Sequence, residues 1–144
     1  MNYDLKQNKL VSIIIPSYNK AQFIEQTLLS VKGQSYNNIE LWIVDAESDD
    51  GSSLILEKDG GDCSNCLVEP DRGQSDAINK GVQIATGNIV GWLNADDLLF
   101  YNAIEHIVDG FNSNPQAGVV YGGGVKIDVG ENVVKDIPFR PFDR

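Results

Sequence analysis

The sequence predicts an α/β protein with a Rossmann-like, mainly parallel sheet flanked by helices. Short runs of consecutive apolar, β-branched residues recur along the chain, as expected for strands covered on both faces. Segments with helical periodicity alternate with these runs, which is the pattern of βαβ units. The chain has 144 residues, of which 42% are hydrophobic, so it is long enough for one domain with a buried core.

The first two elements are a strand and a helix. A β-branched run over residues 11–15 predicts a buried strand that Pro16 ends, because proline cannot donate a ladder hydrogen bond. Asn19 is suited to cap a helix over about residues 20–31, and Gly33 is suited to end it. The inward face of this helix is predicted to carry Ile24, Leu28 and Val31.

The middle of the chain continues the alternation. A second apolar run predicts a strand over residues 41–44, and a short helix is expected over residues 52–57. After a loop rich in Gly and Asp, residues 66–68 are expected to form a short strand, followed by a helix over residues 75–85. The predicted inward stripe of that helix carries Ile78, Val82 and Ala85.

The last predicted elements are a strand, a helix and a hairpin. Residues 89–93 are a buried-strand run, and Trp92 within it is expected to lie in the core. A helix follows over about residues 103–111, and two strands beyond it are joined by a turn at Gly130-Glu131. The apolar face of the helix carries Ile104, Ile107, Val108 and Phe111.

The charge is acidic and unevenly distributed. Eleven basic and 21 acidic residues give a net charge of −10, which argues against a nucleic-acid backbone as the main partner. From Asp45 to Asp97 there are 12 acidic and 3 basic residues, so nearly all the excess lies there. A solvated acidic face and a divalent-cation site both explain this excess.

Neither a membrane span nor an export signal is expected. No apolar run approaches the roughly 18 residues that a spanning helix needs. Residues 1–9 are polar and lack the hydrophobic core of a signal peptide. We therefore expect a cytoplasmic protein, either free or peripheral at the inner membrane face.

Polar segments follow three of the predicted strands, at residues 16–19, 45–50 and 94–97. In open α/β sheets, ligands bind outside the carboxyl ends of the strands. Asp96-Asp97 is the most informative pair, because adjacent carboxylates at a partly buried site repel unless a cation compensates. Mg²⁺ or Mn²⁺ fits such a pair, since these ions bind one or two carboxylates plus substrate phosphates. The alternative is that these residues only cap helices and form turns.

Other nucleotide-binding and hydrolytic motifs are missing from the sequence. It has no G-x-G-x-x-G turn after a strand and no G-x-x-x-x-G-K-[ST] phosphate loop. It also lacks the G-x-S-x-G elbow of hydrolases. A dinucleotide-binding site, a P-loop and a serine hydrolase are therefore disfavoured.

Five motifs together resemble those of the family 2 glycosyltransferases, which have the GT-A fold. In order along the chain they are residues 11–19 (VSIIIPSYN), 45–52 (DAESDDGS), 69–73 (EPDRG), 76–81 (DAINKG) and 91–97 (GWLNADD). Each motif is weak alone, but the combination is specific and is similar to the bacterial branch that builds surface polysaccharides. The resemblance implies inverting, metal-dependent transfer from a nucleoside-diphosphate sugar of the UDP or GDP type to a saccharide or lipid-linked acceptor.

The resemblance also implies which residues meet the nucleotide. Pro16, Ser17 and Tyr18 would form the floor beneath the nucleobase. Asp45 would contact the base or the ribose. Many relatives carry a second Asp after this one, but the sequence has Ala there, so Asp45 acts alone or with Glu47.

The last motif would hold the metal. By resemblance, Asp97 is the direct ligand of Mg²⁺ or Mn²⁺, and Asp96 shares the metal site while contacting the ribose or donor sugar. Arg72 would neutralise phosphate charge. The other expected donor-site residues are Asp71, Asp76, Asn79 and Asn94.

The resemblance covers the donor half of such an enzyme. Relatives place their acceptor-binding half, with the carboxylate general base, beyond the metal motif, and the sequence ends 47 residues after Asp97. We therefore expect residues 1–144 to form a single nucleotide-sugar-binding domain of a longer enzyme, and we assign no general base. Two alternatives are a catalytically inactive nucleotide-binding module and a nucleotidyltransferase, although the latter typically needs a Gly-rich, basic loop that residues 17–20 do not supply.

Overall fold

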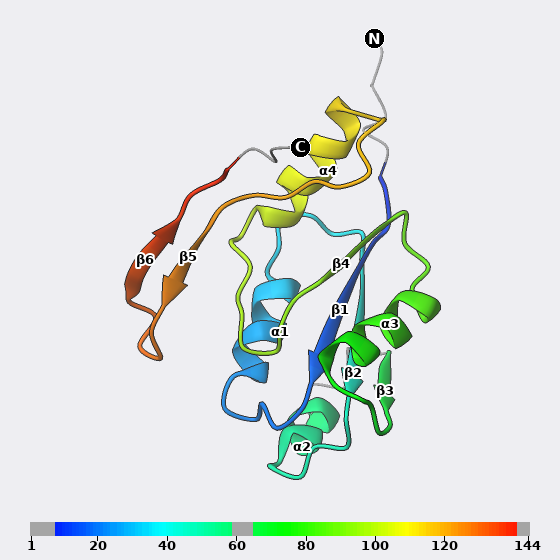
Figure 1. Cartoon of the computed structure of the whole chain (residues 1–144), viewed down its shortest axis with the longest axis vertical. Helices are drawn as coiled ribbons and strands as arrows, with labels where there is room; N and C mark the ends of the chain where they lie inside the picture. The colour runs from blue at the N-terminus through cyan, green and yellow to red at the C-terminus, as the bar shows by residue number, and fades with distance from the viewer. Residues whose placement is uncertain (1–7, 59–64, 141–144) are drawn as a thin grey trace.

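A parallel four-stranded sheet with the order β3-β2-β1-β4 forms the centre of the molecule (Figure 1). The structure is a computed structural model that describes residues 8–58 and 65–140. Its parallel strands are β1 (Val11–Ser17), β2 (Ile39–Asp45), β3 (Cys66–Val68) and β4 (Ile89–Trp92). An antiparallel hairpin of β5 (Gly124–Ile127) and β6 (Val133–Ile137) forms a separate second sheet. The predicted α/β class with a mainly parallel sheet is confirmed.

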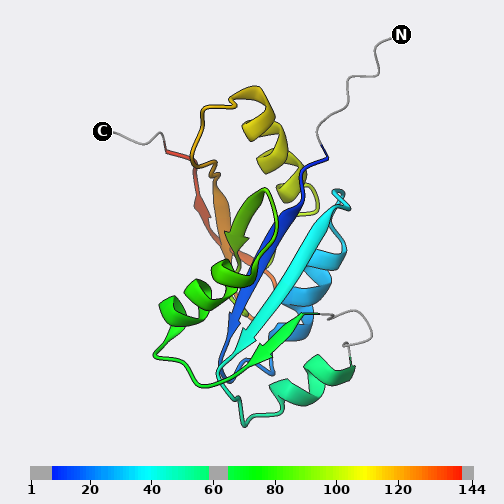
Figure 2. The ribbon, with the colours of Figure 1, turned by 90° about the vertical axis from the view of Figure 1, so that its right-hand side faces the viewer.

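Helices cover both faces of the parallel sheet, and Figure 2 shows α1 and α3 on opposite sides. The helices are α1 (Ile24–Lys32), α2 (Ser52–Lys58), α3 (Gln74–Ile84) and α4 (Ala103–Ser113). Side chains of β1 alternate between two apolar clusters, as the strand period of two requires. Ile13 and Ile15 pack with residues of α1, α2 and α4, whereas Ile14 packs with Val44 and with Ala77 of α3.

Pro16 does not end the first strand, contrary to the prediction. It pairs with Val44 of β2 and is buried within β1. The carbonyl of Ile14 faces β4, since it accepts a hydrogen bond from the backbone of Leu93 (2.9 Å). Two residues later the backbone of Pro16 faces the same side, but the β1–β4 ladder already ends at Trp92. The missing N–H of Pro16 therefore removes no ladder bond.

Helix α1 begins later than predicted, because Asn19 is not its cap. Asn19 has a positive φ of 52°, and its side chain accepts a hydrogen bond from the backbone of Asp49 (3.0 Å). Phe23 occupies the N-cap position, and residues 21–23 form a turn. Gly33 is the C-cap, as predicted. The predicted inward residues Ile24, Leu28 and Val31 are all buried.

The buried face of α3 differs from the predicted stripe. Ala77 and Gly81 are buried, whereas Val82 is exposed. A Cβ atom at Gly81 would lie only 2.4 Å from Cγ2 of Ile14, so the helix rests directly on β1. Small residues permit this close approach, whereas the predicted inward residues Ile78 and Ala85 are only partly buried.

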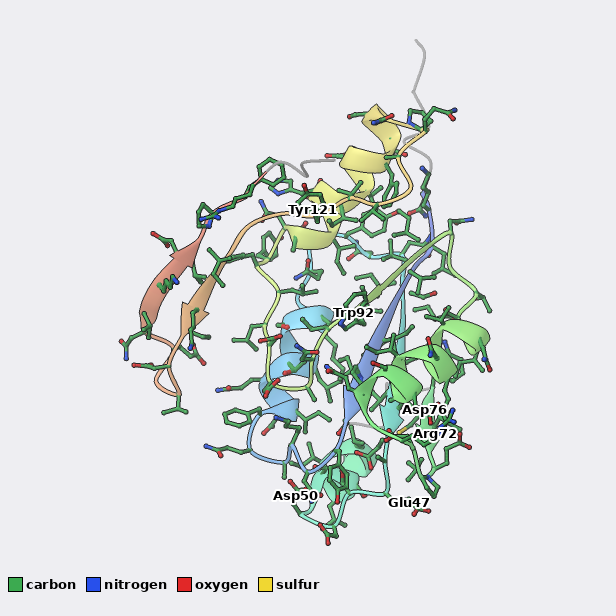
Figure 3. All side chains as sticks on the ribbon, in the orientation of Figure 1. Glu47, Asp50, Arg72, Asp76, Trp92 and Tyr121 are labelled. Atoms are coloured by element: carbon green, nitrogen blue, oxygen red, sulfur yellow. The ribbon has the colours of Figure 1, made fainter. Side chains whose placement is uncertain are left out.

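The prediction that Trp92 lies in the core is wrong, because β4 is one of the two edge strands of the parallel sheet. The residue is 61% exposed, and Figure 3 labels it on β4. The predicted inward residues of α4 are confirmed, with Ile104 and Val108 buried and Ile107 and Phe111 partly buried. Within residues 8–58 and 65–140, no helix has the length and apolar character to cross a bilayer.

Candidate donor site

The candidate site lies where β1, β2 and β4 end. Hydrogen bonds join the loop that follows β1 to the loop that follows β2. The backbone N–H of Asn19 donates to Oγ of Ser48 (2.9 Å), and that of Lys20 donates to Oγ of Ser52 (3.2 Å). Asp50 accepts a hydrogen bond from the backbone of Ala21 (2.9 Å). These bonds fix the path of the chain after β1, and so the positions from which its side chains reach the site.

Asp50 is the anchor of this junction. Oγ of Ser52 donates to its carboxylate (2.5 Å), as does the backbone N–H of Ser52 (3.0 Å). The Ser52 hydroxyl, followed by the N–H of Ala21, holds the pKa of Asp50 below its usual value, so the group is ionised at neutral pH. Figure 3 labels Asp50 and Glu47 in the loop beside α2.

Asp45, expected to meet the base or ribose, is completely buried at the end of β2 (0% exposed). Its two carboxylate oxygens accept hydrogen bonds from the backbone and the hydroxyl of Ser48, each 2.8 Å. In this arrangement Asp45 shapes the loop after β2. Glu47 in that loop is exposed and has a positive φ of 57°.

A cavity of about 410 Å³ opens between the ends of β1 and β4 and the start of α3. This volume is within the usual range for small-molecule sites. Its lining consists of Pro16, Ser17, Tyr18 and Lys20 near the end of β1, Asp71, Gly73, Gln74 and Ala77 at the start of α3, and Asn94, Ala95 and Asp96 after β4. Ser17 is 3% exposed, and its hydroxyl has no hydrogen-bond partner among the described residues. A polar ligand atom could satisfy this hydroxyl.

The two adjacent carboxylates after β4 have different partners. Nζ of Lys20 lies 2.6 Å from Oδ2 of Asp96. Oδ2 of Asp97 accepts a hydrogen bond from the amide of Asn94 (2.8 Å), whose own oxygen accepts one from Nε2 of Gln74 (2.5 Å). Asp96 is therefore paired with a cation from the loop after β1, whereas Asp97 is held by a chain of amides that starts at α3.

The basic side chains beside α3 are occupied with acidic neighbours. Arg72 is 89% exposed and pairs with Asp76 (3.0 Å), and Figure 3 labels both residues beside α3. This contact lowers the pKa of the Asp76 carboxyl below its usual value. Nζ of Lys80 lies 2.8 Å from Oε1 of Glu69 and donates a hydrogen bond to the carbonyl oxygen of Pro70 (2.7 Å). Both contacts tie α3 to the loop that precedes it.

The structure brings together only part of the predicted donor site. The predicted residues that line the cavity are Pro16, Ser17, Tyr18, Asp71, Asn94 and Asp96. The predicted residues outside its lining are Asp45, Glu47, Arg72, Asp76, Asn79 and Asp97. Among these, Asp97 follows directly on the lining residue Asp96 and is hydrogen-bonded to the lining residue Asn94.

Two polar side chains that line this cavity, those of Lys20 and Gln74, were not predicted from the sequence. Lys20 directly follows the polar segment after β1, so its position was the available signal. Gln74 follows Gly73, whose φ of 114° is in the left-handed region that favours glycine. A glycine turn that opens a helix beside a strand end is a signal for a lining residue, but the motif alone does not show which side chain faces inward.

A second, larger cavity of about 810 Å³ lies between α1, the loop after β4 and the β5–β6 hairpin. Asp96 and Asp97 both line it, so Asp96 borders both cavities. Nε2 of Gln26 donates to the carboxylate of Glu131 (3.2 Å), which connects α1 to the tip of the hairpin. Asp96 therefore lies at the boundary between the two cavities, and its neighbour Asp97 lines the larger one.

Comparisons with known proteins agree on one family. The model of "Glycosyl transferase family 2" matches residues 12–142. An uncharacterized glycosyltransferase of Rickettsia conorii is 35% identical over 130 residues, which are 89% of this chain and 22% of the relative. The poly-beta-1,6-N-acetyl-D-glucosamine synthase of Staphylococcus epidermidis is 31% identical over 114 residues, 78% of this chain and 28% of the relative. The chain spans 19% to 40% of the length of such curated relatives.

Solved structures show a similar fold. The mannosyltransferase PcManGT of Pyrobaculum calidifontis, solved with GDP-Man and Mn²⁺, has a TM-score of 0.56 and 31% identity over 62% of this chain and 28% of its own. The TarS protein of S. aureus (residues 1–349, with UDP-GlcNAc) has a TM-score of 0.66 over 81% of this chain and 40% of its own. At 20% identity, the likeness to TarS concerns the fold alone.

Proposed function

The chain belongs to glycosyl transferase family 2, and on this premise we propose that it provides the donor-binding part of a glycosyltransferase. The family and the GT-A fold, both predicted from the motifs, are confirmed. The proposed enzyme transfers a sugar from a nucleoside-diphosphate sugar to a saccharide or lipid-linked acceptor in the synthesis of cell-surface polysaccharide. The observation that carries this proposal is a cavity in which an aromatic ring, a buried hydroxyl and a carboxylate of the Asp96-Asp97 pair converge.

The proposed donor is of the UDP or GDP type. Tyr18 is exposed at the cavity and offers a ring on which a base can stack, and Ser17 offers a hydroxyl without a partner among the described residues. The 31% identical mannosyltransferase with bound GDP-Man supports a nucleoside-diphosphate donor. The relative named as a poly-N-acetyl-glucosamine synthase supports a polysaccharide product. Arg72 is paired with Asp76 and does not line the cavity.

The residues present fit a divalent metal. Asp96 and Asp97 are exposed carboxylates on one loop. Oδ2 of Asp96 already binds a cation, the ammonium group of Lys20. No cluster of three His, Cys, Asp or Glu side chains suited to a metal occurs among the described residues. Two carboxylates completed by substrate phosphates are what Mg²⁺ or Mn²⁺ commonly uses. Such an ion, held by Asp97 and Asp96, would supply positive charge beside the leaving diphosphate.

The acceptor is proposed to enter from the larger cavity, because Asp96 borders both volumes. The transfer is proposed to be inverting, with the acceptor hydroxyl deprotonated by a carboxylate as it attacks the anomeric carbon. Asp128 lines the larger cavity but is a poor base, because hydrogen bonds from Asn132, chiefly from its backbone, hold the pKa of Asp128 below its usual value. A lipid-linked acceptor would bring the reaction to the inner face of the membrane.

Calorimetric titration with UDP and GDP, with and without Mn²⁺, tests the donor site. We expect Mn²⁺-dependent binding by the wild type and a loss of at least about tenfold in Asp97→Asn, which removes the charge at nearly constant shape. Asp136→Asn, an exposed acid on β6, is the matched control and should bind like the wild type. Unchanged metal-dependent binding in Asp97→Asn would exclude the proposed ligand role.

A turnover assay with UDP- and GDP-sugars, run on this chain and on any longer protein that contains it, separates the alternatives. Release or transfer of the sugar supports the glycosyltransferase. Metal-dependent binding without any turnover, in the longer protein as well as in this chain, supports an inactive nucleotide-binding module. Exchange of pyrophosphate into a nucleoside triphosphate supports a nucleotidyltransferase.

A further inference from the structure

The ion pair between Lys20 and Asp96 joins two segments that are 76 residues apart in the sequence. Its Nζ–Oδ2 distance is 2.6 Å, and the side chains are 37% and 38% exposed. Both residues line the smaller cavity. The pair therefore stands at the wall of the donor site, where water and a ligand can reach it.

The backbone of Lys20 is held by hydrogen bonds, while its side chain has one ionic partner among the described residues, Asp96. Its N–H donates to Oγ of Ser52 (3.2 Å), and its carbonyl accepts hydrogen bonds from the backbones of Phe23 and Ile24 (both 2.9 Å). A lysine ammonium is a compact charge on a flexible four-carbon stem. Lys20 can therefore change partners within the cavity without any movement of the loop that carries it.

Lys20 is the only basic side chain among the described residues that line this cavity, and it shares the wall with Asp71 and Asp96. The nearby basic residues Arg72 and Lys80 lie outside the lining and are paired with Asp76 and Glu69. An empty cavity with this lining has an excess of negative charge. A diphosphate brings further negative charge into this cavity, so a cation beside the diphosphate stabilises its binding.

We propose that Lys20 is an exchangeable counter-ion of the donor site. Its ammonium neutralises Asp96 in the ligand-free protein, and it transfers to the diphosphate of the donor when a divalent ion takes the carboxylate. This inference rests on the proposed function and adds that Lys20 and the metal compete for Asp96. Lys20 therefore weakens the binding of the metal alone, but it strengthens the binding of the nucleotide together with the metal.

Lys20→Met tests the competition, because it removes the charge and keeps most of the stem. We expect Mn²⁺ alone, measured by calorimetry or by the spin-resonance signal of the free ion, to bind about two- to fivefold more tightly, as suits the loss of an exposed ion pair. With Mn²⁺ saturating, UDP or GDP should bind about tenfold more weakly, since a charge-assisted contact to phosphate is lost. These changes have opposite signs, which a merely structural ion pair would not produce.

Two further variants serve as controls. Lys32→Met removes an exposed lysine from the end of α1 and should leave both affinities unchanged. Lys20→Arg keeps the charge and should stay closer to the wild type than Lys20→Met in both titrations. Thermal unfolding of each variant shows whether it has retained the fold.

The outcomes separate this inference from the function on which it rests. If the wild type binds Mn²⁺ and nucleotide and Lys20→Met changes neither affinity, or changes both in the same direction, the exchange is refuted and the donor site stands. If the wild type binds neither UDP nor GDP with Mn²⁺, the proposed function fails and the exchange falls with it. Only opposite shifts in Lys20→Met, absent from Lys32→Met, support the exchange.

Discussion

Gly81 is the point at which α3 approaches β1 most closely, and Gly81→Ala should destabilise the protein. The new Cβ would lie 2.4 Å from Cγ2 and 2.9 Å from Cγ1 of Ile14. Ile14 is 0% exposed and is packed against Val44 and Ala77, so it has no free space to enter. Either Ile14 leaves its rotamer or the helix moves away from the sheet.

The cost follows from two opposing effects. Overpacking a close-packed core costs about 1–3 kcal/mol. Alanine in place of glycine favours the helix by about 1 kcal/mol. The 2.4 Å contact with Ile14 places the overpacking cost in the upper part of its range, about 2–3 kcal/mol, so we expect a net loss of about 1–2 kcal/mol in the free energy of unfolding. A shifted α3 would also move Gln74, so metal-dependent nucleotide binding should weaken with it.

Urea unfolding of wild type and variant measures this loss as a lower midpoint at constant slope. Gly110→Ala in α4 is the matched control, because its Cβ would meet only the side chain of Val120, whose nearest methyl is 2.9 Å away and which lies in a partly exposed loop that can adjust. Gly110→Ala should leave the free energy of unfolding unchanged or raise it. In Gly81→Ala combined with Ile14→Ala, the new methyl group enters the vacated space, so the combined loss should be about 1 kcal/mol less than the sum. A Gly81→Ala protein as stable as the wild type would refute the close-contact argument.

Two further predictions concern polar groups. Burial alone would raise the pKa of Glu40, but hydrogen bonds from Ser12 and Thr86 outweigh it and hold this pKa below 4.5. Glu40→Gln should therefore lower the free energy of unfolding by about 1–2 kcal/mol at neutral pH. This difference from the wild type should shrink as the pH falls below about 4.5, because the carboxylate is then protonated. A difference in the free energy of unfolding that stays constant in urea from neutral to acid pH would contradict this. Gln74→Ala removes the first amide of the chain that holds Asp97, so Mn²⁺-dependent UDP or GDP binding should weaken about two- to tenfold in calorimetry. The exposed neighbour Ser75→Ala should bind normally, and equal affinities in the two variants would count against the positioning role of Gln74.

Most of the fold was predictable because its signals are local. Runs such as residues 11–15 are continuous in the sequence, and the helical faces of α1 and α4 repeat at a fixed spacing. The failures occurred where a distant neighbour decided the outcome. Pro16 continues β1 because β4 ends two residues earlier in the register, and Trp92 is exposed because β4 is an edge strand.

The candidate site was predictable in its location but not in its connections. The motifs place Ser17, Asn94 and Asp96 at strand ends, and the structure finds all three in one cavity. Two further contacts were not visible in the motifs. Lys20 reaches Asp96 across the sheet edge, and Gln74 reaches Asn94 from the start of α3. Both depend on side-chain directions set by how the loops and α3 pack.

The amino-acid sequence alone was sufficient for the family, the α/β class and the acidic pair after β4, because each depends on residue order and spacing along one segment. The partners of that pair could be found only in three dimensions. An ion pair between Lys20 and Asp96 joins residues 76 positions apart, and no local pattern encodes a contact of that kind. Their meeting requires that β1 and β4 run side by side in parallel, which brings both carboxyl ends to the same edge of the sheet.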